Sequence, residues 1–184
     1  MERPSEALEH RTVRLVRWRT GDAEWAFDLV TQALDHLRPY MPWADGYSAE
    51  QNLAFLRSCE QDWDAGTSFQ YSVHHQGHPV GSCGLLRRPE TETGVMEIGY
   101  WLHPDHTGKG LATDSARLLV TAAFALSDVG AVEIVHDEGN HASGAVPRRL
   151  NFTRIGTRRS LPPLPPADSG TEVIWSLTRQ QAAG

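Results

Sequence analysis

The residues best suited to chemistry lie in one segment, 95–113, where a predicted strand leads through a glycine-containing loop into a predicted helix. Gly108 and Gly110 flank Lys109 in this loop. Glycine lets the backbone approach a ligand closely, and the amides in the first turn of a helix have no intrahelical acceptor. Together these features predict an anion site that suits a phosphate or pyrophosphate group. A tight turn with no ligand is the plain structural alternative.

The spacing of this loop argues against nucleotide hydrolysis. The phosphate loop of nucleotide hydrolases ends in a lysine followed by serine or threonine, whereas Gly110 follows Lys109 here. A protein that binds nucleotide phosphates without hydrolysing them is a further interpretation, and competition by ATP but not by coenzyme A would favour it.

The histidines and cysteines predict no metal centre. The histidine clusters at 74–78 and 103–106 match no zinc signature, and the two cysteines form no Cys-x-x-Cys pair. His74 or His75 could instead line the acceptor side of a site as a proton carrier. Cys83 follows a strand pattern with no basic residue near it in sequence, which predicts a small buried side chain rather than a nucleophile.

Length and charge limit the class of protein. The chain has 184 residues and a net charge of −6, which is the wrong sign for a general nucleic-acid binder. It contains no apolar run long enough to span a bilayer, and residues 1–19 lack an apolar signal core. We therefore expect one cytoplasmic domain over residues 1–184 that binds neither a membrane nor, directly, nucleic acid.

Hydrophobic periodicity predicts the elements that must position these residues. The predicted order is βααβββαβαββ, an α+β fold around one mixed and largely antiparallel sheet flanked by helices. Residues 1–10 are expected to be a loose leader and residues 160–170 a Pro-rich loop, and a hairpin turn is expected at Gln76-Gly77. The predicted strands are 12–18, 67–75, 79–88, 95–102, 131–136, 152–159 and 171–177. The predicted helices begin near 20 and 48 and span 109–127 and 143–150.

Two motifs give the chain a family resemblance. Residues 108–113 (GKGLAT), after residues 99–102 (GYWL), resemble the acyl-CoA motif of the GNAT acyltransferase superfamily. Residues 140–143 (Asn-x-x-Ser), followed by residues 150–152 (LNF), are similar to that family's second marker. Both motifs occur in the family's order and at its separation, so the pair is more specific than either motif alone.

Two further segments are similar to the RimJ/RimL-like subgroup, whose members modify protein N-termini. These are the loop that contains Trp43 and the tail at 173–178 (VIWSLT). The resemblance runs from about residue 12 to residue 179, nearly the whole chain. It implies the GNAT fold and an N-acetyltransferase that uses acetyl-CoA as its co-substrate.

The resemblance also implies where acetyl-CoA binds. The pyrophosphate would lie on the amides of residues 107–112, and the pantetheine arm would pair like an extra strand with the strand that ends at 100–102. A backbone amide there would hold the thioester oxygen as negative charge develops on it. The expected contacts are Tyr100, Trp101, Leu102, Thr107, Gly108, Lys109, Gly110, Leu111, Ala112, Thr113, Asn140 and Ser143.

Glu97 and Ser143 are the candidate catalytic residues. An attacking amine is mostly protonated at neutral pH, because α-amines titrate near ~8, so the reaction needs a base. Glu97 alternates with Met96 and Ile98, and its carboxylate could accept the proton through water. A solvated or ion-paired strand glutamate is the structural alternative. Ser143 follows the subgroup's pattern as proton donor to the leaving thiolate, although a simple helix N-cap would also explain a serine there.

The chain departs from the family at three positions. Thr107 stands where a Gln or Arg is usual, so one pyrophosphate contact is lost or shortened. Pro147 occupies the position at which many relatives have a tyrosine that protonates the thiolate. Asn151 replaces the glycine of the second marker, and asparagine tolerates a left-handed backbone better than most residues. The first two departures keep open a non-catalytic module that binds acyl-CoA.

On the acceptor side, the resemblance favours a protein or peptide N-terminus. A small amine, such as an antibiotic or a polyamine, is the alternative acceptor, and another acyl group than acetyl is compatible with the sequence. Tyr40, Trp43 and His75 are the candidate acceptor contacts. A homodimer is expected from the subgroup alone.

Overall fold

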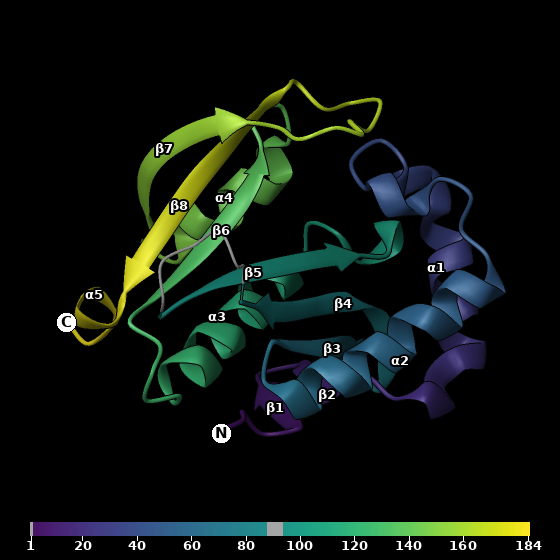
Figure 1. The fold of residues 1–184 in the computed structure, drawn as a ribbon, viewed down its shortest axis with the longest axis horizontal. Helices are drawn as coiled ribbons and strands as arrows, with labels where there is room; N and C mark the ends of the chain where they lie inside the picture. Colours follow the sequence, from purple (N-terminus) through teal and green to yellow (C-terminus); the bar gives the residue numbers. More distant parts are fainter. Residues whose placement is uncertain (1, 88–93) are drawn as a thin grey trace.

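The computed structural model describes residues 2–87 and 94–184. Eight strands form one sheet in the order β1-β2-β3-β4-β5-β6-β8-β7, and every neighbouring pair is antiparallel except β5 with β6 (Figure 1). The mixed, largely antiparallel sheet flanked by helices is therefore confirmed. The strands are Ala7–His10 (β1), Val13–Arg17 (β2), Ser68–His75 (β3), His78–Leu86 (β4), Val95–Leu102 (β5), Ala131–Asp137 (β6), Thr153–Arg159 (β7) and Thr171–Thr178 (β8). The α-helices are Ala23–Leu37 (α1), Ala49–Ala65 (α2), Leu111–Phe124 (α3), His141–Arg149 (α4) and Arg179–Ala182 (α5).

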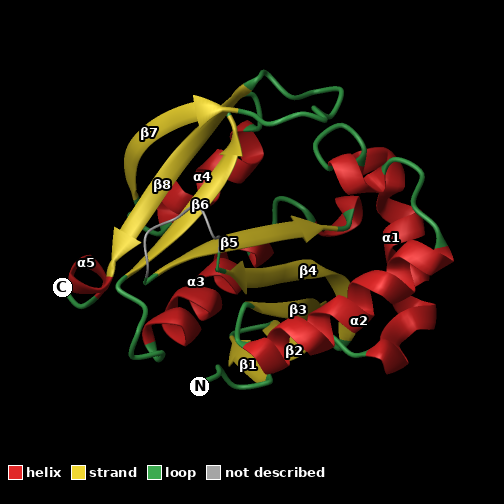
Figure 2. Ribbon diagram, in the orientation of Figure 1, coloured by secondary structure: helices red, strands yellow, loops and turns green. Residues whose placement is uncertain are grey.

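The helices form a layer on each side of the sheet. Helices α1 and α2 lie on one face, whereas α3 and α4 lie on the other (Figure 2). On β5, Met96 and Ile98 are almost fully buried in the main core together with Leu119 of α3. The intervening residues of β5 point to the face of α1 and α2, because side chains alternate along a strand. The two faces of β5 therefore serve different layers.

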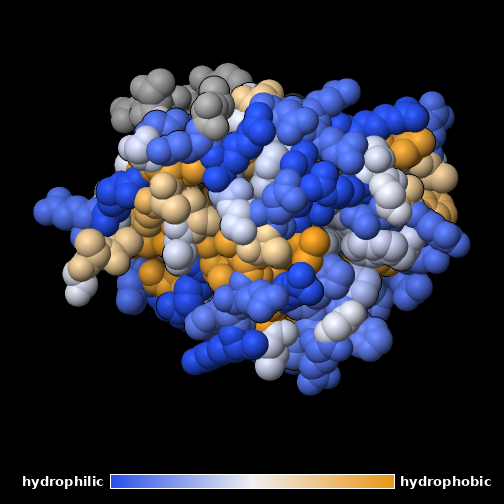
Figure 3. Space-filling view, turned by 90° about the horizontal axis from the view of Figure 1, so that it is seen from below, coloured by the Kyte–Doolittle hydropathy of each residue, from blue (hydrophilic) through white to orange (hydrophobic). Residues whose placement is uncertain are grey.

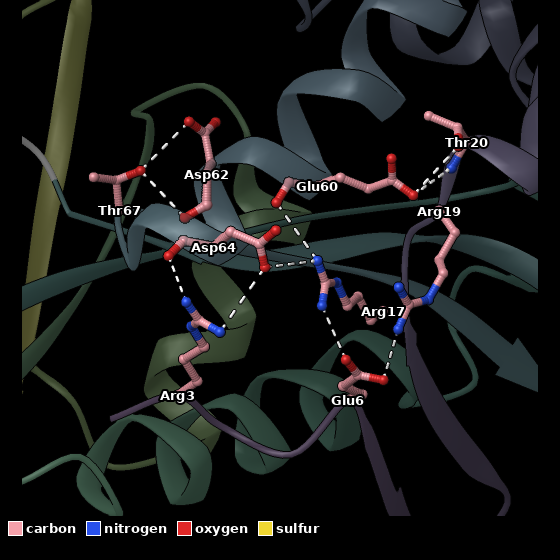
Figure 4. A network of polar contacts seen from close by, with 9 residues as sticks. All are labelled: Arg3, Glu6, Arg17, Arg19, Thr20, Glu60, Asp62, Asp64 and Thr67. Atoms are coloured by element: carbon pink, nitrogen blue, oxygen red, sulfur yellow. Dashed lines mark hydrogen bonds and ion pairs between the residues drawn. The ribbon is translucent and has the colours of Figure 1, made fainter. Parts of the chain in front are cut away.

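The N-terminal residues are part of the sheet, so the expectation of a loose leader over residues 1–10 was wrong. Strand β1 pairs with β2, with Ala7 opposite Val16. The guanidinium of Arg17, whose side chain is only 9% exposed, contacts Glu6 at 2.9 Å and Asp64 of α2 at 3.4 Å (Figure 4). A buried charge is costly without a partner. Arg17 therefore ties the N-terminal segment and α2 to the same edge of the sheet.

Several local predictions are confirmed at the residue level. The hydroxyl of Ser48 caps α2 by accepting from the amide of Gln51. Gln76 and Gly77 form the β3–β4 turn with φ values of 51° and 84°. The predicted strand 79–88 ends at Arg88, which lies outside the described residues.

The Pro-rich loop between β7 and β8 contacts the segment that follows α1. The amide of Ala167 donates to the carbonyl of Pro39, just after α1, over 2.9 Å. This bond links the half of the sheet that carries β6, β8 and β7 to the helical layer beside β3 to β5, at the open end of the sheet (Figure 1).

Hydrophilic side chains cover much of the surface seen from below, and apolar residues show between them (Figure 3). Within residues 2–87 and 94–184, no helix is both long and apolar enough to cross a membrane.

Candidate active site

The site lies where the two parallel strands separate. Strands β5 and β6 pair only from Val95 with Ala131 to Ile98 with Ile134. Beyond this point β5 continues beside β4, while β6 continues beside β8, so the two strands diverge (Figure 1). Residues 99–102 therefore have no strand on their β6 side within the described chain. Their backbone groups can pair with an extended ligand as with an added strand.

The glycine loop follows β5 directly. Gly108 and Gly110 have φ values of 72° and 80°, and the space around each Cα is open. Gly110 is the N-cap of α3, and the amides of residues 108–113 have no acceptor in the part of the chain that the structure describes. Free amides at a helix start, with no side chain above them, form an anion site. The predicted loop is thus in place.

Thr107 and Lys109 are held within the loop itself. The hydroxyl of Thr107 donates to the carbonyl of Pro104 over 2.9 Å, and its amide donates to the same carbonyl over 3.2 Å. The ammonium of Lys109 donates to the carbonyl of Asp105 over 2.8 Å. Thr107 therefore shapes the loop, and its hydroxyl hydrogen is already used.

The second motif closes the other side of the opening. The side chain of Asn140 caps α4 by accepting from the amide of Ser143 at 3.1 Å. Ser143 is therefore a residue of the first turn and not the N-cap, which corrects the predicted start of this helix. Asn151 has a φ of 59°, so the left-handed turn expected at this position is confirmed. Pro147 lies inside α4 and is buried.

A pair of hydrogen bonds joins β5 to α4 across the opening. The hydroxyl of Tyr100 donates to the carbonyl of Ser143 over 2.9 Å, and the hydroxyl of Ser143 donates to the Tyr100 oxygen over 3.2 Å. Burial raises the pKa of Tyr100 to about 12, so its hydroxyl stays protonated at neutral pH. The family resemblance places both residues at the pantetheine but does not predict their contact, since nothing in their spacing signals it.

Helix α4 packs against the side chain of a buried histidine. His136 of β6 accepts from the indole of Trp175 at Nε2, over 3.0 Å, while its Nδ1 lies 2.7 Å from the carbonyl of Asp137. A Cβ added at Gly144 would lie 2.7 Å from the ring of His136. The absence of a side chain at Gly144 therefore lets α4, and with it Ser143, sit close to the sheet.

This packing makes Gly144→Ala a test of how α4 is held. We expect a loss of about 1–3 kcal/mol in the free energy of unfolding, because the new methyl group forces α4 or His136 to move. Activity should fall with it, since Ser143 moves with the helix. Gly156→Ala on β7 is the control, because no atom lies near that position. Thermal unfolding of both variants checks the prediction, and equal melting temperatures would contradict it.

Glu97 lies on the β5 face that points toward α1 and α2. It is half-buried and pairs in register with Leu86 of β4 and with Glu133 of β6. Gly99, two residues further along, occupies the same face at about 7 Å. Glu97 therefore directly precedes Ile98, the last residue of β5 that pairs with β6, and so lies next to the opening.

Beside this opening lies a cavity of about 650 Å³ between α1, α2, the turn Pro42–Ala44 and strands β3 to β5. We call it the α1–α2 cavity. Gly99, Tyr100 and Trp101 of β5 form one of its walls. Its other lining residues include Trp18, Val30, Met41, Trp43, Asp45 and Phe55. The cavity therefore begins at the unpaired end of β5.

Of the three predicted acceptor contacts, only Trp43 lines the α1–α2 cavity. Tyr40 lies outside it, because the turn after α1 sends Met41 and Trp43 inward instead. His75 is also outside: it ends β3, and its ring lies 6.3 Å from that of His106, near the glycine loop. Neither Tyr40 nor His75 therefore lines this cavity, and a role of either residue in acceptor binding stays a prediction.

Burial determines the character of His74 and Cys83, two other side chains that the sequence singles out. His74 is half-buried against Trp25, and burial lowers its pKa. Cys83 is 2% exposed, and burial raises the pKa of its thiol, so it is a buried side chain as predicted. No group of three His, Cys, Asp or Glu residues that could hold a metal occurs within the described ranges.

Comparison with known proteins identifies the class. The profile of the family described as "Acetyltransferase (GNAT) domain" matches residues 12–153. "Putative ribosomal N-acetyltransferase YdaF" of Bacillus subtilis (strain 168) is 29% identical over 163 residues, which is 82% of this chain and 82% of that protein. The chain belongs to the GNAT acetyltransferase family, and it is an N-acetyltransferase of this type.

Solved structures share the fold. The chain is similar to RimL, a ribosomal L7/L12 alpha-N-protein acetyltransferase in complex with coenzyme A, with a TM-score of 0.86 and 22% identity over 96% of this chain and 99% of that chain. It is also similar to the microcin C7 self-immunity acetyltransferase MccE in complex with acetyl-CoA and AMP. That comparison has a TM-score of 0.82 and 18% identity, and it covers 92% of this chain and 93% of that chain.

Proposed function

We propose that this protein transfers the acetyl group of acetyl-CoA to an α-amine at the N-terminus of a protein or peptide, by direct attack in a ternary complex. The observation that carries the proposal is the separation of β5 from β6, with the glycine loop following β5 and the α1–α2 cavity beside it. Relatives named as ribosomal protein N-acetyltransferases support this choice of acceptor.

In this proposal the donor half of the site binds the pyrophosphate, the pantetheine arm and the sulfur of acetyl-CoA. The amides of residues 107–112 would hold the pyrophosphate, with Thr113 closing the first turn of α3. The pantetheine arm would pair with residues 100–102 along the unpaired edge of β5. Asn140 and Ser143 would lie beside the sulfur. The free amides and the open space over the glycines are what fit this assignment.

The reaction then needs three proton transfers, two from the nitrogen and one to the sulfur. Glu97 accepts the proton of the attacking amine through water, and the amine nitrogen adds to the thioester carbon. A backbone amide of residues 100–102 stabilises the negative oxygen. The added nitrogen releases its second proton to water, the carbon–sulfur bond breaks, the sulfur keeps the electron pair, and Ser143 delivers a proton to it. Solvent returns the proton to Ser143, and the carboxylic acid of Glu97 releases its proton to solvent.

Small amines are the second candidate class of acceptor. The α1–α2 cavity has the volume of a pocket for a compact ligand, because such pockets measure ~300–1,000 Å³. The MccE structure with AMP shows that a protein of this fold was crystallised with a small molecule besides acetyl-CoA. A non-catalytic acyl-CoA module is the third candidate, and release of coenzyme A in the presence of an amine excludes it.

Calorimetric titration tests the donor site. We expect micromolar binding of acetyl-CoA and of desulfo-CoA, and none of ATP. Gly110→Ala should weaken acetyl-CoA binding about tenfold, because the new methyl group occupies the space over the loop amides. Gly77→Ala is the matched control: both glycines have φ near +80° and open surroundings, so both changes cost stability by about 1–2 kcal/mol. Folded protein that binds no coenzyme A would refute the proposal.

A further inference from the structure

The side chains that line the α1–α2 cavity range from fully buried to exposed. Its inner part contains Trp18 and Cys83, each 2% exposed, while Trp43 and Phe55 at its rim are 41% and 42% exposed. Aromatic rings follow one another along it, since the ring of Trp43 lies 6.2 Å from that of Trp101. The cavity is therefore an apolar recess that opens to solvent.

The polar groups of this wall bond largely to one another. The hydroxyl of Tyr47 donates to Asn52, whose amide donates to the carbonyl of Ala23, both over 2.8 Å. The hydroxyl of Ser82 accepts from the indole of Trp18 at 3.0 Å and donates to a backbone carbonyl. A ligand in the cavity would therefore meet mainly apolar atoms and few unused hydrogen-bonding groups.

The charge of the cavity is negative. Asp45 is its only charged lining residue and is exposed, and its carboxylate has no hydrogen bond or ion pair to any residue in the described part of the chain. A carboxylate at the rim attracts a cationic amine and repels a carboxylate. The recess thus combines apolar walls with one acidic group.

From these features we infer that the acceptor carries a large apolar or aromatic group close to its amine, and that this group enters the α1–α2 cavity. This inference rests on the proposed function, which supplies the amine and the donor. The amine would lie at Gly99, where the cavity meets the unpaired edge of β5. A serine or alanine side chain would leave most of the apolar wall exposed to water. A phenylalanine, tryptophan or leucine side chain would cover it.

The test uses peptides that differ only in their first residue: Ser, Ala, Leu, Phe or Trp. With the chain of residues 1–184 and acetyl-CoA, we expect kcat/KM for Phe to exceed that for Ser by about 10- to 100-fold, the size expected from burying one large apolar side chain. Trp43→Ala should remove most of this preference. Tyr40→Ala is the matched control, because Tyr40 has a similar exposure, 39%, but lies outside the cavity.

A second variant fills the cavity instead of enlarging it. Val30→Phe should abolish the preference for Phe while leaving acetylation of the Ser peptide measurable. Acetyl-CoA titration and thermal unfolding of each variant establish that it is folded. Equal or better rates with the Ser and Ala peptides in the unmodified protein would overturn the inference and leave the proposed function intact.

Two amines separate failure of the inference from failure of the proposed acceptor. If no peptide reacts although acetyl-CoA binds, 2-phenylethylamine is compared with ethylamine. Faster acetylation of 2-phenylethylamine would support the apolar acceptor group and refute the peptide acceptor. Absence of turnover with every peptide and both amines would refute both statements.

Discussion

Glu97→Gln should lower kcat/KM at neutral pH by about 10²- to 10³-fold, the usual contribution of a positioned general base. The amide cannot accept the proton that the attacking amine must lose. The affinity for acetyl-CoA should change little, because Glu97 lies at the paired end of β5, before the edge at residues 99–102 that would hold the pantetheine. Steady-state kinetics together with calorimetric titration separate the two quantities.

The pH dependence sharpens this prediction. An α-amine with a pKa near ~8 is mostly protonated at pH 7 and mostly neutral above pH 9. The deficit of Glu97→Gln should therefore be largest near neutrality and shrink as pH rises, because a neutral amine needs less help from a base. Glu133→Gln, at the adjacent register position on β6, is the control and should retain its rate. An unchanged rate in Glu97→Gln would remove Glu97 from the mechanism.

Ser143→Ala should lower kcat by about 10- to 100-fold, with acetyl-CoA affinity nearly unchanged. The effect is smaller than at Glu97 because a coenzyme A thiolate is a stable leaving group that solvent can protonate. Tyr100→Phe should lower kcat to a similar extent, since the hydroxyl of Tyr100 contacts both the carbonyl and the hydroxyl of Ser143. Tyr100 acts here as a positioning residue.

The double variant decides whether Tyr100 acts through Ser143. If it does, Ser143→Ala combined with Tyr100→Phe should be no slower than the slower single variant, because effects of residues that act as a unit do not add. Tyr71→Phe is the control: its hydroxyl also donates to a backbone carbonyl, that of Ser5, but lies away from α4. Fully multiplicative losses would show that Tyr100 and Ser143 act independently.

Local features of this protein follow from the sequence because their causes are local. The turn at Gln76-Gly77, the cap at Ser48 and the left-handed Asn151 depend on residues a few positions apart. The glycine loop before α3 belongs to the same group, since φ at Gly108 and Gly110 is a property of the glycines themselves. The periodicities of strands and helices likewise need no knowledge of neighbours.

Only the tertiary structure decided which of these elements meet. Strand β1 pairs with β2, and the neighbouring Glu6 partners the buried charge of Arg17; periodicity in residues 1–10 reveals neither contact. Tyr100 reaches Ser143 across 43 positions of sequence, because β5 leaves β6 just where α4 begins to cover the opening.

The acceptor side depended most on tertiary structure. Trp43, Tyr40 and His75 are equally plausible wall residues in sequence, yet only Trp43 turns into the α1–α2 cavity. The direction of each side chain depends on the turn after α1 and on the register of β3, which packing between distant segments determines. The amino-acid sequence by itself therefore determined the donor loop and the reaction class, whereas the shape and polarity of the acceptor cavity arise only when α1, α2 and the sheet come together.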